Sequence, residues 1–218
     1  MNDLLFPRTS LISSVHALRK DLLSEGGPRI STMRNYRFAI LPYDPRKEFE
    51  LRNHIRKLSD ELKSMGWNVL SISLKRILMS RLKSEDSRVI ESFMRREHKL
   101  YQNDPNRALS YLKDKLMPYI EEPDGVASAV VKLIGEFADR YSVEKEKTLI
   151  FVGRAGALYP FFRSSSLLKH IDGKTRNIPV VLLYPGERRD LTALSFMGEL
   201  PADRDYRPRI YDDNIHEQ

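Results

Sequence analysis

The sequence predicts an α/β fold with a mostly parallel central sheet flanked by helices and a helical insertion in the middle of the chain. Three observations carry this prediction. A strand, a helix and a strand follow one another over residues 36–72, helical patterns then run almost unbroken over residues 74–141, and strand patterns return over residues 148–211. Strands that alternate with helices are typical of a parallel sheet that is covered by helices on both faces.

The composition is that of a globular protein, with 41% hydrophobic and 31% charged residues among 218. A chain of this length can bury a substantial core, and we interpret residues 1–218 as a single domain. The absence of cysteine excludes disulfides, thiolate zinc sites and cysteine nucleophiles. No apolar run approaches the length that a bilayer requires, and Pro7 and Arg8 interrupt the apolar start at Leu4–Phe6, so we expect a cytoplasmic protein without membrane contact.

The first predicted element is an amphipathic helix over residues 8–24. Its apolar residues recur at helical spacing on one face, at Leu11, Val15, Leu18 and Leu22. Two glycines at positions 26 and 27 end the helical pattern. This helix therefore has one face suited to packing on a sheet.

Residues 36–72 are predicted to form a β-α-β unit with parallel strands. A strand over residues 36–41 is followed by Asp44 and Pro45, which suit the N-cap and the first helical position. The helix after them carries an apolar stripe of Leu51, Ile55, Leu58, Leu62 and Met65. A short apolar run over residues 67–72 supplies the second strand.

The segment of residues 74–141 is predicted to form three or four helices inserted between strands of one sheet. Prolines at positions 105, 118 and 123 mark the expected breaks between these helices. A separate helical domain would have little core of its own, which favours an insertion.

Residues 148–211 are predicted to form the second α/β half. Strands are expected over residues 148–152 and 179–184, with a glycine loop and a helix that includes Pro160 between them. Pro185–Gly186 is expected to end the second strand. A short strand or turn within residues 191–197, an edge strand over residues 206–211 that contains Pro208, and a polar tail over residues 212–218 complete the chain.

Basic side chains exceed acidic ones by 7 in the whole chain, and the surplus is concentrated in the helical segment. Between Lys75 and Lys115 there are eleven basic and six acidic side chains. Such a region can attract phosphates or an acidic protein surface, but it is also typical of a solvated helical face with mixed charges. No nucleic-acid-binding motif accompanies it, which favours the solvated face.

Three strand-end turns, at Asp44, Gly153 and Gly186, are predicted to form the candidate binding surface. The carboxyl ends of parallel strands lie at one edge of a sheet, where ligands of open α/β folds bind. The candidate binding residues come from these turns and from the segment after the second one: Tyr43, Asp44, Gly153, Arg154, Gly156, Tyr159, Arg163, Ser164, Tyr184, Gly186 and Glu187.

The stretch from Gly153 to Ala157 has two interpretations. Glycines at a strand-to-helix junction allow the backbone to approach a phosphate closely. The stretch lacks the lysine and the Ser/Thr of a phosphate loop, however, and it does not fit the G-x-G-x-x-G pattern, which favours a tight structural turn. Arg163 with Ser164–Ser166 could likewise hold a phosphate or a carboxylate, or simply begin a helix.

The sequence predicts no catalytic residues, no metal site and no cofactor. The five histidines have no metal-ligand spacing, and Ser164–Ser166 do not lie in a nucleophile elbow. The carboxylates of Asp44, Glu48 and Glu50 could suggest a nuclease-like cluster. A helix cap and a first helical turn explain them better.

Three stretches of the chain resemble the BrxB family of bacterial BREX phage-defence systems. They are Leu41–Pro45 with Glu48, Gly153–Arg163 continuing to Leu167–Leu168, and Leu183–Gly186. In order and spacing the resemblance covers residues 36–211. The family commonly has a histidine between Arg163 and Leu167, where this chain has serines, so no histidine-based role is carried over.

The resemblance implies a small accessory protein that acts with other BREX components, which include a PglZ-type alkaline-phosphatase-like protein, a large ATPase and a DNA methyltransferase. It implies no enzymatic activity. Our leading hypothesis is a non-catalytic interaction protein of phage defence that uses the carboxyl edge of the sheet or the basic helical segment to bind a partner, which we expect to be the PglZ-type protein. The alternative is a nucleotide- or nucleic-acid-binding protein that uses the Gly153 loop and the basic helical segment. A phosphoester hydrolase is a third hypothesis, and it would need a metal site that the sequence does not provide.

Overall fold

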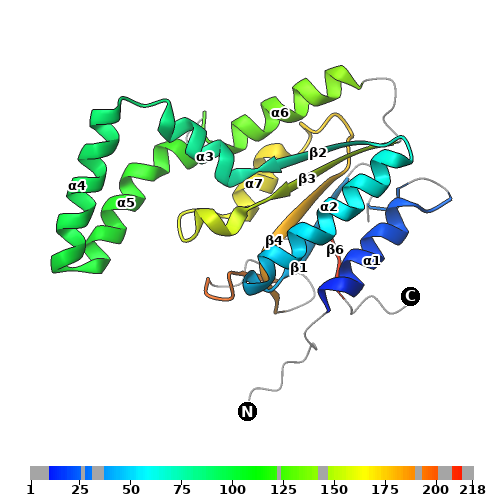
Figure 1. Cartoon of the computed structure of the whole chain (residues 1–218), viewed down its shortest axis with the longest axis horizontal. Coiled ribbons are helices and arrows are strands. Elements are labelled where there is room, and N and C mark those ends of the chain that lie inside the picture. Colours follow the sequence, from blue (N-terminus) through cyan, green and yellow to red (C-terminus); the bar gives the residue numbers. More distant parts are fainter. Residues whose placement is uncertain are drawn as a thin grey trace, which may run out of the picture.

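A six-stranded sheet lies between two layers of helices in the computed structural model, which describes residues 10–25, 28–30, 37–121, 124–141, 147–189, 193–200 and 208–212 (Figure 1). The strands are β1 (Phe38–Tyr43), β2 (Asn68–Ser73), β3 (Thr148–Gly153), β4 (Val180–Arg188), β5 (Leu194–Phe196) and β6 (Arg209–Ile210). Their order is β2-β3-β4-β1-β6 with parallel pairing throughout, and β5 pairs antiparallel with the end of β4. The predicted α/β class is confirmed.

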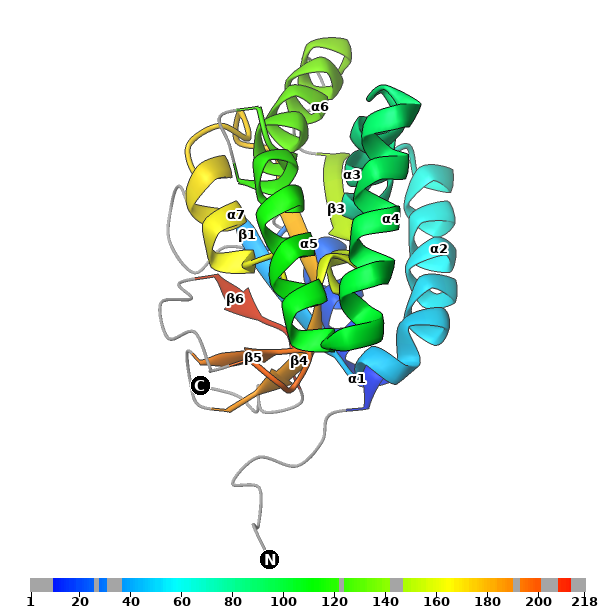
Figure 2. The same cartoon turned by 90° about the vertical axis from the view of Figure 1, so that its left-hand side faces the viewer.

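The helices of the described residues divide between the two faces of this sheet. They are α1 (Leu11–Leu22), α2 (Glu48–Ser64), α3 (Leu74–Lys83), α4 (Ser87–Asn103), α5 (Pro105–Ile120), α6 (Val126–Arg140) and α7 (Ser164–Ile171), with the short 3-10 helices η1 (Pro45–Lys47) and η3 (Ala155–Leu158). α1 and α2 pack on one face, whereas α3, α6 and α7 pack on the other (Figure 2).

Burial of both faces explains the continuous apolar runs of the strands. In β1, Phe38 and Ile40 join the core with α6 and α7, while Ala39 and Leu41 join the core with α1 and α2. Successive side chains of a strand point to opposite faces, so a sheet covered on both sides needs apolar residues at every position. All six residues of β3 are buried for the same reason.

The predicted β-α-β unit forms, and β1 and β2 run parallel, but these strands are not neighbours. β3 and β4 lie between them in the sheet. The predicted apolar stripe of α2 is buried except for Met65, which is 44% exposed. Met65 is the C-cap residue beyond the last helical turn, so it no longer follows the buried face.

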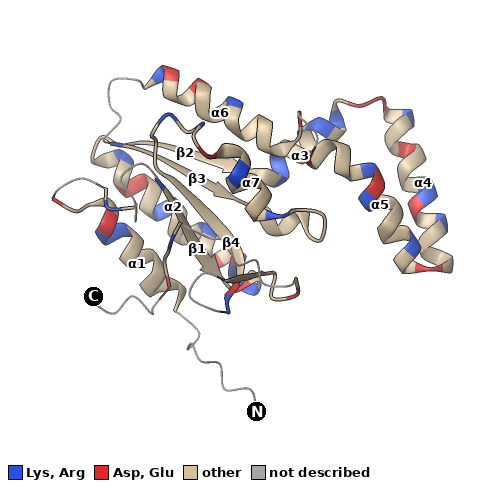
Figure 3. Ribbon diagram, turned by 180° about the vertical axis from the view of Figure 1, so that it is seen from behind, with Lys and Arg blue, Asp and Glu red and all other residues tan. Residues whose placement is uncertain are grey.

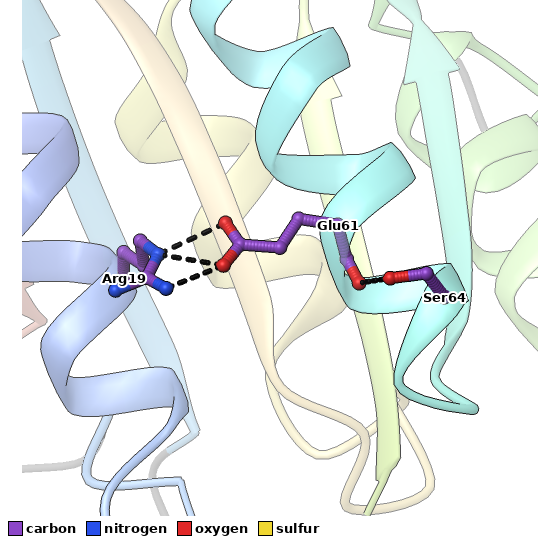
Figure 4. A network of polar contacts seen from close by, with 3 residues as sticks. All are labelled: Arg19, Glu61 and Ser64. Carbon is purple, nitrogen blue, oxygen red and sulfur yellow. Dashed lines mark hydrogen bonds and ion pairs between the residues drawn. The ribbon is translucent and has the colours of Figure 1, made fainter.

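Near the C-terminal end of α2, an ion pair connects α1 to α2. The Nε atom of Arg19 lies 2.9 and 3.0 Å from the two carboxylate oxygens of Glu61 (Figure 4). Hydrogen bonding to the Arg19 guanidinium lowers the pKa of the Glu61 carboxyl. The hydroxyl of Ser64 donates to the backbone carbonyl of Glu61 at 2.6 Å, which closes the last turn of α2.

Four helices, α3 to α6, connect β2 to β3, which are neighbours in the sheet. This agrees with the predicted insertion. Asp104 caps α5 and Pro105 begins it, as expected for that break. The break at Pro118 is wrong, because Pro118 lies within the last turn of α5, and Pro123 lies outside the described residues.

Two predicted boundaries in the second half are also wrong. Pro185–Gly186 does not end β4, which continues to Arg188 by exchanging its parallel neighbours for β5. The Pro185 carbonyl accepts a bond from the Met197 amide at 2.7 Å, so the strand remains paired after a proline that cannot donate. Pro160 lies in a turn rather than in the helix, since α7 begins at Ser164.

The described residues after position 207 pack into the fold, including one that was predicted to lie in the polar tail. β6 forms the expected edge strand beside β1. Asp212, which was assigned to the polar tail, is instead buried and lies 2.6 Å from Arg188. Arg209 pairs with Asp21 of α1 at 2.7 Å. The remaining predicted tail, residues 213–218, lies outside the described residues.

In the part of the chain that the structure describes, no helix combines the length and the apolar character needed to cross a membrane.

Candidate functional site at the carboxyl edge of the sheet

The chain leaves β1 and β3 toward opposite faces of the sheet. After β1 it enters η1 and α2 on one face, and after β3 it enters η3 and α7 on the other. β4 lies between these two strands. Such divergence opens the position where open α/β sheets bind their ligands. Here the extension of β4 and β5 occupies part of that position.

A polar cluster joins the two diverging connections. The Tyr43 hydroxyl at the end of β1 donates to the Glu48 carboxylate at the start of α2. Arg154, which follows β3, donates to the other oxygen of Glu48 at 3.2 Å. The three side chains are partly or fully buried, and burial, with the hydrogen bond to Glu48, raises the pKa of the Tyr43 phenol. Glu48 therefore connects the first and second predicted turns.

Glycines allow the second and third turns to approach each other. A Cβ atom at Gly153 would lie 3.1 Å from the Leu183 side chain, and one at Gly156 would lie 3.1 Å from Met197 and 3.3 Å from Pro185. Arg154 between them has φ +64°, the left-handed conformation, and precedes a 3-10 helix of four residues. This geometry agrees with the tight structural turn favoured for the stretch.

The remaining candidate residues separate into buried and surface positions. Tyr184 and Ser164 are buried, and the Tyr184 ring packs edge-on against Phe196 with centroids 5.5 Å apart. Arg163 is exposed, and Tyr159 is 36% exposed. A binding role for these four residues stays a prediction. Arg163 and Tyr159 are the two that a partner can reach.

Asp44, Gly186 and Glu187 have partners within the fold. Asp44 caps η1 by accepting from the Arg46 amide at 3.0 Å. Gly186 is buried against β5, and the Glu187 carboxylate pairs with Arg189. The predicted cap function of Asp44 is therefore confirmed, although the element it caps is a 3-10 turn that leads into α2.

Sequence reasoning missed two residues of this edge. Glu48 was explained as a first-turn carboxylate, yet it accepts from both Tyr43 and Arg154. Phe49 beside it is 72% exposed, the most exposed large apolar residue among those described. Its place off the buried stripe of α2 is the signal that could have revealed it.

Replacing Tyr43 by Phe is expected to lower the free energy of unfolding by about 1 kcal/mol at neutral pH, because Glu48 loses a donor. It is also expected to flatten the loss of stability in alkali. The fold keeps the Tyr43 phenol protonated, so this stabilisation is complete below about pH 10, the ordinary tyrosine pKa, and is lost as the pH rises further. Urea titrations between neutral and strongly alkaline pH measure both effects, and equal alkaline slopes for the two proteins contradict the assignment.

Among the described residues, no group of three or more His, Asp or Glu side chains lies where it could hold a metal ion. The carboxylate at the centre of the edge, Glu48, has its oxygens engaged by a phenol and a guanidinium. The cluster therefore fixes the connection after β1 relative to the connection after β3. The outer surface of the edge is formed by other, exposed side chains.

Comparisons with known proteins cover the second and third turns of this edge, whereas the family match begins after the first turn and leaves out Tyr43, Asp44 and Glu48. The sequence model of a family described as BREX protein BrxB matches residues 70–210. A BREX protein BrxB from Bacillus cereus (strain H3081.97) is 20% identical over 171 residues, which cover 78% of this chain and 80% of that relative. No solved structure matches the chain. Because the family match takes in well over half of the chain, from β2 to β6, the chain belongs to the BrxB family of BREX proteins.

Proposed function

We propose that this protein is a non-catalytic accessory protein of BREX phage defence that binds another component of the system, the PglZ-type protein. Membership of the BrxB family is the observation that carries the proposal. Family membership supports a role within a BREX system, and exposed aromatic and basic side chains at the carboxyl edge of the sheet support binding there.

The chemistry of that edge supports a protein partner. Phe49 is 72% exposed at the start of α2, the Arg46 side chain is 76% exposed in η1, and Tyr159 is 36% exposed after η3. Aromatic residues and arginine are enriched at the centres of protein interfaces. An exposed phenylalanine on a rigid helix start is a suitable anchor, because little side-chain entropy is lost when it binds.

The polar cluster beside Phe49 favours binding without a large rearrangement of the protein. Glu48 precedes Phe49 directly and is held by Tyr43 at the end of β1 and by Arg154 after β3. The helix start therefore has a fixed orientation relative to β1 and β3. Preorganised anchors increase affinity, since less ordering is required on association.

Phe49→Ser is expected to weaken partner binding at least about tenfold without changing thermal stability, because the ring is exposed in the free protein. Met65→Ser is the matched control, since Met65 is an exposed apolar residue at the other end of the same helix. Each protein is immobilised in turn and challenged with the PglZ-type protein, the ATPase and the methyltransferase.

Two results oppose the proposal in different ways. If none of the three components is retained by the unaltered protein at micromolar concentration, the interaction function is wrong. If the PglZ-type protein is retained equally by Phe49→Ser, Met65→Ser and the unaltered protein, the interaction stands but does not use the carboxyl edge.

A further inference from the structure

The helical hairpin of α4 and α5 stands away from the sheet and contributes little to the two cores (Figures 1 and 2). α4 has no buried side chain, and α5 buries only Ala108 and Ile120. Ordering two helices costs conformational entropy, which burial of an apolar face normally offsets. The few residues that the hairpin buries therefore offset little of the entropy cost of ordering its two helices.

Large apolar side chains remain exposed on the hairpin. Met94 and Tyr101 of α4 are 66% and 58% exposed, and Leu109 of α5 is 45% exposed. Met94 and Tyr101 are seven residues apart, so they lie on the same side of α4. Tyr101 and Leu109 both lie toward the end of the hairpin at which α4 passes into α5. The apolar positions thus concentrate on one part of its surface.

A basic stripe follows the solvent side of α4. Arg88, Arg95 and Lys99 fall at intervals of seven and four residues, which places them along one face of the helix, with Glu91 between Arg88 and Arg95 on the same face. Arg88 lies 3.7 Å from the capping residue Asp86. Among the described side chains, neither Arg95 nor Lys99 forms an ion pair with a carboxylate. Figure 3 shows basic positions along both helices of the hairpin.

We propose that this hairpin surface, formed by Met94, Tyr101, Leu109, Arg95 and Lys99, docks on a protein partner that presents an apolar patch rimmed by acidic side chains. The proposal rests on the proposed function and names a second surface through which it acts. Carboxylates on the partner complement the two unpaired cations, and its apolar patch covers the exposed methionine, tyrosine and leucine.

The apolar residues distinguish a protein partner from a nucleic acid. A phosphate backbone satisfies Arg95 and Lys99, but it offers no apolar surface for Met94 and Leu109. Methionine, tyrosine and arginine are together typical of the centre of a protein interface. α4 packs against α5 on one side and has no buried residue, so its other side is accessible to a partner.

The experiment compares two hairpin double variants with a control of equal charge change. Met94→Ser/Tyr101→Ser removes apolar contacts, and Arg95→Glu/Lys99→Glu reverses the basic stripe. Lys57→Glu/Lys63→Glu makes the same change in charge at exposed positions of α2. Thermal unfolding of each variant should match that of the unaltered protein. Binding is then measured by surface plasmon resonance to the BREX component that the unaltered protein retains.

We expect the apolar variant to bind at least about tenfold more weakly. The charge-reversed variant should associate at least about tenfold more slowly at low salt and lose most of its salt dependence, whereas the α2 control should stay within about twofold of the unaltered protein.

Three outcomes overturn the inference. If all variants bind equally well, the hairpin is not a docking surface, while the proposed function is unaffected. Retention of no component by the unaltered protein removes both. Tight binding of a labelled duplex DNA that Arg95→Glu/Lys99→Glu abolishes, with no effect of Met94→Ser/Tyr101→Ser on any component, assigns the hairpin to nucleic acid instead.

Discussion

Replacing Gly186 by Ala is expected to lower the free energy of unfolding by about 3 kcal/mol, because the site has no room for a Cβ atom. That atom would lie 2.1 Å from the Ser195 carbonyl oxygen and 2.7 Å from the Tyr184 ring. The oxygen belongs to the backbone of β5, which is paired with β4 at this residue. Relief therefore requires the two strands to separate, and the bonds around them weaken together.

The matched control is Gly135→Ala in α6. Nothing lies within 4 Å of a Cβ atom at Gly135, and alanine is the better residue in a helix interior. This control is expected to raise the free energy of unfolding by about 0.5–1 kcal/mol. Urea unfolding followed by the fluorescence of the buried Trp67 measures both variants. Equal urea midpoints for Gly186→Ala and the unaltered protein contradict the close packing of β4 on β5.

Removing the carboxylate of Asp212 is expected to destabilise the fold by about 3 kcal/mol. The Asp212 and Arg188 side chains are 6% and 14% exposed, and two hydrogen bonds of 2.6 and 2.8 Å join them. Asp212→Ala leaves the Arg188 guanidinium largely buried without this carboxylate. Keeping the guanidinium buried after this carboxylate is lost costs more than the pair itself contributes, so Arg188→Leu/Asp212→Leu should recover much of the lost stability.

An exposed ion pair supplies the comparison for this second prediction. Arg88 and Asp86 are 90% and 55% exposed and lie 3.7 Å apart. Arg88→Ala should change the free energy of unfolding by less than about 0.5 kcal/mol, because solvent screens such pairs. If Asp212→Ala has as small an effect as Arg88→Ala in the same urea titration, the segment after β6 does not stabilise the fold.

Local sequence patterns were sufficient to predict several helices and strands of this protein. The stripe from Leu51 to Leu62 predicted α2, the apolar run over residues 148–152 predicted β3, and Asp44 with Pro45 predicted a capped start. Each of these signals depends on residues within a few positions of one another. Helical periodicity, strand burial and capping are local in the same sense, which explains their success.

Contacts between distant residues account for three predictions that were wrong or incomplete. Pro185–Gly186 has the composition of a turn, but pairing with Ser195 and Phe196 keeps it in a strand. Asp212 belongs to a polar sequence, but Arg188 makes it part of the buried structure. Glu48 resembled an ordinary first-turn residue until Arg154, more than a hundred positions later, was found beside it.

The sequence by itself determined the α/β class, the insertion of helices over residues 74–141, the glycine-rich connection after β3 and the resemblance to the BrxB family. Periodicity and short motifs are enough for these features, since each is encoded within a single segment. Only the tertiary structure decided that β3 and β4 separate β1 from β2, that Tyr43, Glu48 and Arg154 form one cluster, and that the α4–α5 hairpin stays largely unburied. These features depend on which distant segments pack together, and that choice is made by burial and pairing over the whole fold.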